Sequence, residues 1–152
     1  MTMDAPMTDP AEIAVSLFQS KFNCAQSVLA AFAPRLGLEQ GQALKLASPF
    51  GGGVARRGQV CGTVTGALMA LGFVHGADTP AGKEDAYRLG QEFLGRFESK
   101  HGTILCWELL GFDISMPEGR RQAQEKDLFN SLCPLFVRGA AEIVQAMLSE
   151  RP

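Results

Sequence analysis

The chain has 152 residues, of which 46% are hydrophobic and 20% are charged, and its formal net charge is −2. This length allows one domain with a substantial core. The near-neutral charge, without a basic stripe, excludes a nucleic-acid-binding protein because nothing would neutralise the phosphates. We interpret the two basic pairs, Arg56-Arg57 and Arg120-Arg121, as solvated loop charges.

Residues 1–8 lack the basic start and apolar run of a secretory signal, and we expect them to form a disordered tail. No run of eighteen uninterrupted apolar residues occurs, which predicts that nothing is inserted into a membrane. We therefore expect a soluble, cytoplasmic protein. In a reducing cytosol, cysteines are more often catalytic or metal-bound than joined in structural disulfides.

The first half of the chain predicts three helices followed by a glycine-rich loop. Asp9 precedes Pro10, the residue favoured at a first helical position, and Asn23 can cap a second helix. A third, short helix over residues 40–47 ends at Ser48-Pro49, where proline stops it. The loop over residues 49–58 then carries Gly51, Gly52, Gly53 and Gly58.

The second half predicts a central apolar helix over residues 60–74 and an amphipathic helix opened by Thr79-Pro80. A short helix capped by Thr103 and a loop beginning at Met116-Pro117 precede a terminal helix over residues 134–148. The predicted buried faces hold Tyr87, Phe93, Leu94, Phe97, Leu135, Ile143 and Met147. No alternating strand pattern occurs. We predict a single all-α domain over residues 9–150, a compact bundle of six to eight helices with the glycine-rich loop before the central helix.

Four single cysteines, Cys24, Cys61, Cys106 and Cys133, each fall at the predicted start of a helix. A helix N-terminus presents free backbone N–H groups and partial positive charge, so it favours a thiolate. Their spacings contain no C-x-x-C pair, which argues against a zinc finger, a ferredoxin, a thioredoxin-type dithiol and covalent haem. Several helix N-termini can nevertheless meet at one end of a bundle and place the thiols together. The alternative is that the cysteines are four unrelated small core residues.

The glycines Gly51, Gly52, Gly53, Gly58 and Gly62 have two interpretations: they let the backbone approach a cofactor closely, or they form tight turns and close helix contacts. No G-K-[ST] sequence follows the loop, which argues against nucleotide binding. His75 and His101 each precede a glycine at a predicted helix end, where we favour a capping role over metal ligation. We expect Trp107 to pack in the core.

The run from Phe50 to Gly58, followed by the sequence CGTVTGALM at residues 61–69, resembles the redox-active protein family C_GCAxxG_C_C, which is named for its cysteines and a C-G-A-x-x-G motif. The sequence NCAQSV at residues 23–28, the segment from Gly102 to Gly111 and Cys133-Pro134 are also similar, so the likeness covers roughly residues 10–148. Thr63 stands where the motif has alanine. The resemblance implies a redox role with the four cysteines as the defining residues.

We retain three functional hypotheses. In the first, the four cysteines converge and bind an iron–sulfur cluster or another thiophilic metal for electron transfer. In the second, no metal binds, and a thiol–disulfide oxidoreductase uses one cysteine as nucleophile, for which we select Cys61, and another to resolve the mixed disulfide. In the third, a non-catalytic helical binding protein holds a structural metal. The redox partner is unknown, and the apolar composition is compatible with a homodimer.

Overall fold

The computed structural model describes residues 9–151, and within this range the chain is helical and contains no β-strand. Eight α-helices have five residues or more, and α8 is a single turn, so the prediction of an all-α fold is confirmed. The predicted tail over residues 1–8 lies outside the described residues. The elements are α1 (Pro10–Gln19), α2 (Cys24–Leu36), α3 (Gln40–Ala47), η1 (Ser48–Phe50), α4 (Gly62–His75), η2 (Pro80–Gly82), α5 (Lys83–His101), α6 (Cys106–Leu110), α7 (Pro117–Glu125), α8 (Leu128–Ser131) and α9 (Cys133–Glu150).

Local side-chain chemistry sets the first two helix starts. The Asp9 carboxylate accepts a hydrogen bond from the Ala11 N–H at the start of α1. At α2, the Asn23 side chain accepts from the Gln26 N–H at 2.9 Å, and the Gln26 side chain accepts from the Asn23 N–H at 3.0 Å. This reciprocal capping box fixes the first turn of α2, and therefore Cys24, which is its first residue.

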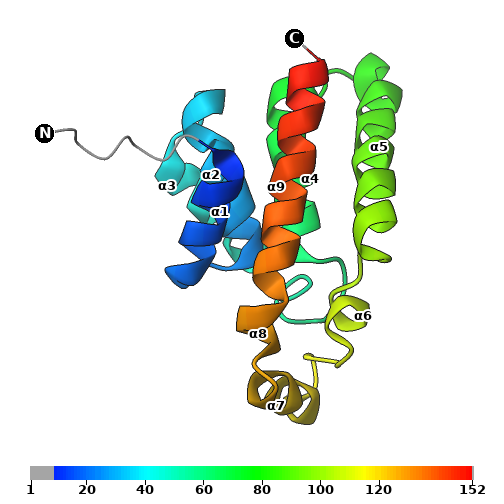
Figure 1. Cartoon of the computed structure of the whole chain (residues 1–152). Coiled ribbons are helices and arrows are strands. Elements are labelled where there is room, and N and C mark those ends of the chain that lie inside the picture. The colour runs from blue at the N-terminus through cyan, green and yellow to red at the C-terminus, as the bar shows by residue number, and fades with distance from the viewer. Residues whose placement is uncertain (1–8, 152) are drawn as a thin grey trace, which may run out of the picture.

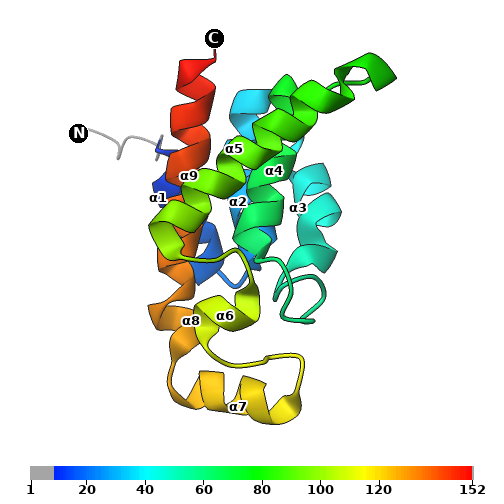
Figure 2. The same ribbon diagram turned by 90° about the vertical axis from the view of Figure 1, so that its right-hand side faces the viewer.

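The helices form a bundle around α2, α4 and α9. Helix α2 packs against α1, α3 and α4, while α9 packs against α1, α4 and α5. The main core is rich in alanine and phenylalanine, with Phe32, Phe93 and Phe97 fully buried. Helices α2, α4 and α9 all begin at the same end of the bundle, where the glycine-rich loop and the short helices α6, α7 and α8 lie (Figure 1 and Figure 2).

Several sequence-based expectations are wrong in detail. Pro117 begins helix α7 and does not lie in a loop, because proline fits the first helical turn. Thr103 does not cap α6; its hydroxyl accepts from the Leu105 N–H, and the helix begins at Cys106. Three side chains expected in the core are exposed: Tyr87 by 58%, Trp107 by 47% and Leu135 by 56%. Single exposed apolar side chains of this kind are normal on protein surfaces.

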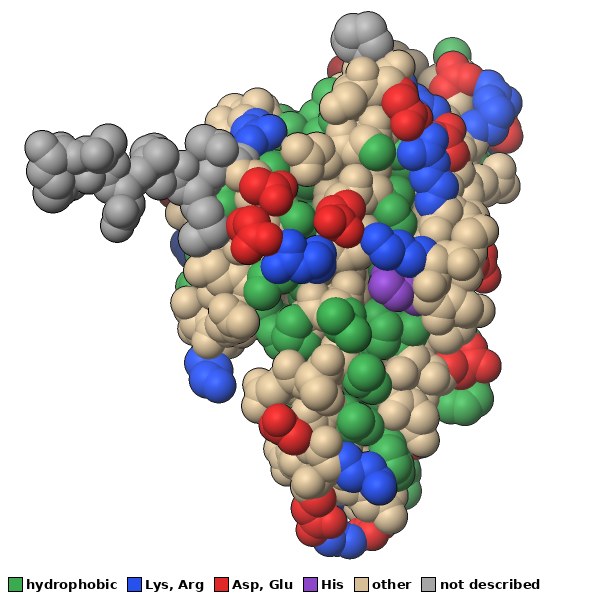
Figure 3. All heavy atoms as spheres, in the orientation of Figure 1, with side chains coloured by type: hydrophobic (Ala, Val, Ile, Leu, Met, Phe, Trp, Pro, Cys, Tyr) green, Lys and Arg blue, Asp and Glu red, His purple; other side chains and the backbone are tan. Residues whose placement is uncertain are grey.

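Helices α8 and α9 together form a long apolar segment. The segment Leu128–Glu150 is long and apolar enough to cross a membrane by length and composition alone. In the bundle it is a core helix, because it packs on α1, α4 and α5 and buries Val137, Val144 and Met147. On one face, acidic and basic side chains gather over the upper part of the bundle, hydrophobic side chains are exposed below them, and further charged side chains lie at the lower tip (Figure 3).

Candidate functional site

All four cysteines line one pocket of about 250 Å³ at the end of the bundle where α2, α4 and α9 begin. Cys24 is the first residue of α2, Cys61 is the N-cap residue of α4, and Cys106 and Cys133 are the first residues of α6 and α9. The structure thus places each cysteine at a helix start, as the sequence indicated. It also brings them to one cavity, which sequence spacing alone could not decide.

The pocket lies between two hydrophobic clusters. Cys61 belongs to the main core, against which Cys24 packs, whereas Cys106 and Cys133 belong to a smaller cluster beneath it with Leu110 and Ile114. Backbone hydrogen bonds join the two parts: the Cys61 N–H donates to Ile104 O at 2.8 Å, and the Cys106 N–H donates to Gln59 O at 2.6 Å. The segments carrying Cys61 and Cys106 are therefore fixed to each other directly.

The Cys61 thiol and three backbone N–H groups surround the Cys24 sulfur. Hydrogen bonding from the Cys61 thiol is the largest influence and lowers the pKa of Cys24 to about 7, although burial opposes it. The backbone N–H groups of Gly52, Ala25 and Gly62 also donate to this sulfur and lower its pKa further. Together with its place at the positive end of a 13-residue helix, these donors make Cys24 the thiolate of the group.

The other three thiols stay protonated at neutral pH. The pKa of Cys61 lies well above its usual range, because its proton is held by Cys24, because it is buried, and because the charge on Cys24 repels a second thiolate. Burial, and then the charge on Cys24, raises the pKa of Cys106 to about 12. The same two causes, with Cys106 as a third, raise the pKa of Cys133 to about 12. These directions favour Cys24 as the nucleophile over Cys61, the residue that the sequence led us to select.

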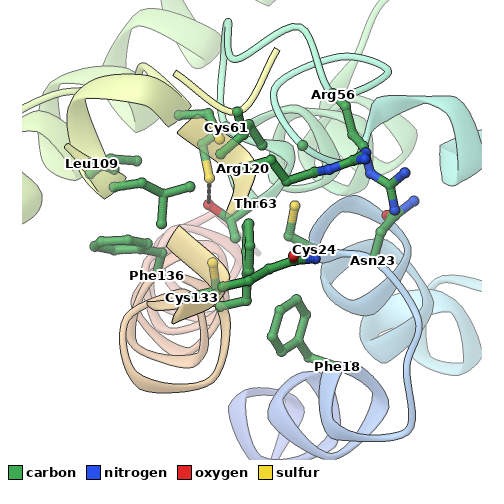
Figure 4. Close-up of a pocket in the computed structure, with 16 residues that line it drawn as sticks. Phe18, Asn23, Cys24, Arg56, Cys61, Thr63, Leu109, Arg120, Cys133 and Phe136 are labelled. Atoms are coloured by element: carbon green, nitrogen blue, oxygen red, sulfur yellow. Dashed lines mark hydrogen bonds between the residues drawn. The ribbon is translucent and has the colours of Figure 1, made fainter. Parts of the chain in front are cut away.

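The Thr63 hydroxyl is a further partner of Cys61. The Thr63 hydroxyl lies 3.1 Å from Cys61 Sγ and is buried (Figure 4). When the Cys61 S–H donates to Cys24, the Thr63 O–H is left to donate to Cys61, so hydroxyl, thiol and thiolate form a short donor chain. Thr63 is the residue that the resemblance singled out as a departure from the motif, and in the structure it contacts Cys61 directly.

The glycines predicted to bind a cofactor have different structural roles. A Cβ on Gly62 would overlap Cys24 Sγ, and a Cβ on Gly53 would lie 2.8 Å from Cys106 Cβ, so both glycines make room for cysteines. Of Gly51, Gly52, Gly53, Gly58 and Gly62, only Gly52 lines the pocket. A Cβ on Gly51 would overlap the Asn23 side chain, and Gly58 has a φ of 71°, which favours glycine.

The glycine-rich loop contains an unusual backbone segment. Residues 52–56 all have positive φ, between 51° and 72°, and three of them, Val54, Ala55 and Arg56, are not glycine. Such a conformation costs roughly 1–2 kcal/mol for each residue with a Cβ. Hydrogen bonds from the Gly58 N–H to Gly52 O at 3.0 Å and from the Gln59 N–H to Gly53 O at 2.9 Å close this left-handed turn. The turn holds Gly52 against Cys24 and carries Arg56 to the pocket.

The predicted metal or iron–sulfur cluster would need a compact set of ligands. Among residues 9–151, no three His, Cys, Asp or Glu side chains are grouped closely enough to hold a metal ion. His75 and His101 do not line the pocket that holds the cysteines. Each is the last residue of its helix, and the Nε2 atom of each is buried without a hydrogen-bond partner. The arrangement of the four thiols therefore does not by itself fit a bound metal.

Two residues of the pocket carry no clear signal in the sequence. Arg56 and Arg120 both line it. Arg56 is exposed in the loop, as expected of a solvated loop charge, whereas Arg120 is half-buried on helix α7, so that interpretation is wrong for Arg120. The position of Arg56 within the glycine-rich run is the one available signal. Arg120 offers none, because it reaches the pocket only through the packing of α7 beneath the bundle.

Comparison with known proteins gives one match. The family profile described as "Putative redox-active protein (C_GCAxxG_C_C)" matches residues 22–147, which is most of the chain and includes all four cysteines. No curated protein matches the chain. No solved structure matches it either. The extent of the match, on residues that the structure gathers around one pocket, shows that the chain belongs to the redox-active C_GCAxxG_C_C family.

Proposed function

We propose that this protein is a thiol–disulfide redox protein in which Cys24 is the attacking thiolate and Cys61 is the resolving thiol. The observation that carries the proposal is the arrangement of Cys24. It lies in a pocket, at a helix N-terminus, and it accepts hydrogen bonds from the Cys61 thiol and three backbone N–H groups. A thiolate stabilised in this way is the reactive form of cysteine near neutral pH.

The reaction has two steps. Cys24 attacks one sulfur of a disulfide R–S–S–R′, forms a mixed disulfide with R and releases R′–S⁻, which takes up a proton. Cys61 then attacks the Cys24 sulfur, forms a Cys24–Cys61 disulfide and releases R–S⁻, which is protonated in turn. The two electrons of the protein dithiol have passed to the substrate, which leaves as two thiols. In the opposite direction, the same steps form a disulfide in the partner.

The first step prepares the second. Two of the three causes that raise the pKa of Cys61 are its hydrogen bond to Cys24 and the charge on Cys24. Both disappear when Cys24 becomes part of a mixed disulfide, because that sulfur no longer carries a charge. The pKa of Cys61 then falls, and the Thr63 hydroxyl at 3.1 Å can donate to the new thiolate. The resolving thiol therefore becomes active only after the first attack.

The reactivity of single-cysteine variants toward a neutral disulfide, 2,2′-dithiodipyridine, tests the proposal. We expect Cys24→Ser to abolish the fast phase of thiopyridone release at pH 7. Cys61→Ser should keep the attack but stop at the mixed disulfide and release one thiopyridone instead of two. Cys106→Ser and Cys133→Ser are matched controls in the same pocket and should keep both phases. A fast phase that survives in Cys24→Ser would contradict the proposal.

A metal-binding role is the second candidate, because all four thiols line one cavity. It ranks lower since the four sulfurs are not grouped as ligands within the described chain. Metal analysis of protein purified without oxygen decides between the two: stoichiometric iron would favour the electron-transfer hypothesis, and stoichiometric zinc would favour a structural site. Either result would place metal binding ahead of thiol–disulfide exchange.

A further inference from the structure

The pocket that holds the cysteines is lined by two arginines and by no acidic residue. Arg56 comes from the left-handed turn and Arg120 from α7. In Figure 4 both side chains extend over the pocket toward Asn23, on the side where Cys24 lies. The polar lining therefore combines two guanidinium groups with thiols and amides, and it contains no carboxylate that would neutralise them.

Neither arginine forms an ion pair with a carboxylate of residues 9–151. The contrast with the next residue on α7 is direct, because Arg121 forms ion pairs with Glu118 and Glu125. Arg138, Lys100 and Arg96 are likewise paired with acidic side chains across the helices. Two guanidinium groups directed at the same cavity repel each other, and this cost is relieved when an anion binds between them.

The chemistry of arginine indicates what kind of anion. A guanidinium group presents planar N–H donors that match the two oxygens of a carboxylate or the oxygens of a phosphate. A pocket of about 250 Å³ is slightly smaller than those that enclose a drug-sized ligand. It therefore suits a small molecule, or one end of a larger one, with its anionic group near the rim and its sulfur inside.

We propose that the pocket recognises a disulfide substrate through an anionic group, a carboxylate or a phosphate, that binds between Arg56 and Arg120 while the substrate sulfur reaches Cys24. This inference deepens the function proposed above and rests on it. The exchange reaction is the same two-step process, and the arginines act as binding residues that select the substrate. The strained backbone at Arg56 is consistent with this role, since strain of this kind is often found where a side chain must be placed for function.

Two disulfide probes of different charge test the inference. The probes are 5,5′-dithiobis(2-nitrobenzoic acid), which carries two carboxylates, and neutral 2,2′-dithiodipyridine. We expect Arg56→Gln and Arg120→Gln each to slow the reaction with the anionic probe about 3- to 10-fold. The reaction with the neutral probe should stay within about twofold, because this probe has no anionic group for the arginines to bind. The ratio of the two rates also cancels any general effect of the substitution on Cys24. Arg57→Gln is the matched control, since Arg57 adjoins Arg56 but does not line the pocket.

The inference is overturned if the anionic probe reacts at the wild-type rate in both variants, or if both probes slow equally. The first result, with Cys24 still reactive, would leave the proposed redox function intact. If Cys24 reacts with neither probe, the proposed redox function fails. The anion site is then tested separately, by measuring whether the protein binds an anion that cannot react with it. NMR titration with S-methylglutathione, which cannot react, and separately with inorganic phosphate should show binding in the wild-type protein and its loss in both arginine variants. No binding of either probe by the wild-type protein would overturn the inference, and their relative affinities distinguish a carboxylate from a phosphate.

Discussion

The hydrogen bond between Cys61 and Cys24 is the interaction on which the proposed chemistry depends most, and Cys61→Ala removes it. With Cys61 present, the pKa of Cys24 is lowered to about 7, so close to half of the Cys24 thiols are ionised at pH 7. Without that donor, burial opposes ionisation while the three backbone N–H groups still favour it, so the pKa rises toward the ordinary value of about 8.5. At that ordinary value the ionised fraction at pH 7 is about 3%, so the variant should lose up to roughly 15-fold in thiolate at this pH.

The assay is the pH dependence of the initial rate with 2,2′-dithiodipyridine between pH 5 and 10. The wild-type profile should rise with a midpoint near pH 7, and the Cys61→Ala profile should rise at a midpoint higher by up to about 1.5 pH units. Cys61→Ser keeps a hydroxyl donor and should recover part of the difference. Cys133→Ala, which removes a protonated thiol from the same pocket, should leave the midpoint unchanged. An unchanged midpoint in Cys61→Ala would refute the reasoning.

Three further predictions follow from the same geometry. Gly62→Ala should lower the free energy of unfolding, measured in urea, by about 1–3 kcal/mol, because the new Cβ overlaps Cys24 Sγ. Gly72→Ala in the same helix is the control: its Cβ meets no atom within 4 Å, so it should stabilise the protein by about 0.5–1 kcal/mol. Equal effects of the two substitutions would contradict the close contact at Gly62. Thr63→Val keeps the volume but removes the donor to Cys61, so stopped-flow kinetics should show the second thiopyridone released about tenfold more slowly while the first is unaffected; slowing of the first phase alone would count against the role of Thr63. The pKa of Cys24 is lowered in the folded protein, so its contribution to stability is present above about pH 8.5 and is lost as the pH falls through 7. The pKa values of Cys61, Cys106 and Cys133 are raised, so their contributions to stability are present below about pH 8.5 and are lost above it. The alkaline loss is about 1.4 kcal/mol per pH unit for each thiol. Urea unfolding of the reduced protein should therefore be most difficult near pH 8.5, and a Cys106→Ala/Cys133→Ala variant should lose much of the alkaline decline; an alkaline slope equal to that of the wild-type protein would be inconsistent with those two buried thiols.

The helix starts that carry the cysteines could be predicted because they depend on neighbouring residues. Asn23 and Gln26 form the capping box before Cys24, and Pro134 occupies a first-turn position beside Cys133. The boundary of α6 was less predictable, because no side chain caps it and the Val60–Leu105 bridge helps to fix Cys106. A tertiary pairing of this kind leaves no local pattern in the sequence.

The detailed chemistry of the site could not be predicted for the same reason. The local sequence offers no ground to prefer Cys24 over Cys61, since the preference comes mainly from the Cys61 thiol and also from the amides of Gly52 and Gly62, all of which are distant from Cys24 along the chain. The close approach of α4 to Cys24 at Gly62 is likewise a result of helix packing. Arg120 lies in a polar stretch whose charge pattern is that of any exposed helix, and only the position of α7 under the pocket gives it a role.

The most direct test of the central claim is to identify the disulfide that the protein forms. The fully reduced protein should be treated without oxygen with one equivalent of 2,2′-dithiodipyridine, alkylated and mapped by mass spectrometry. We predict a disulfide between Cys24 and Cys61, release of two thiopyridones, and Cys106 and Cys133 recovered as alkylated thiols. A disulfide between Cys106 and Cys133, or a stable adduct on Cys24 with Cys61 alkylated, would contradict the account.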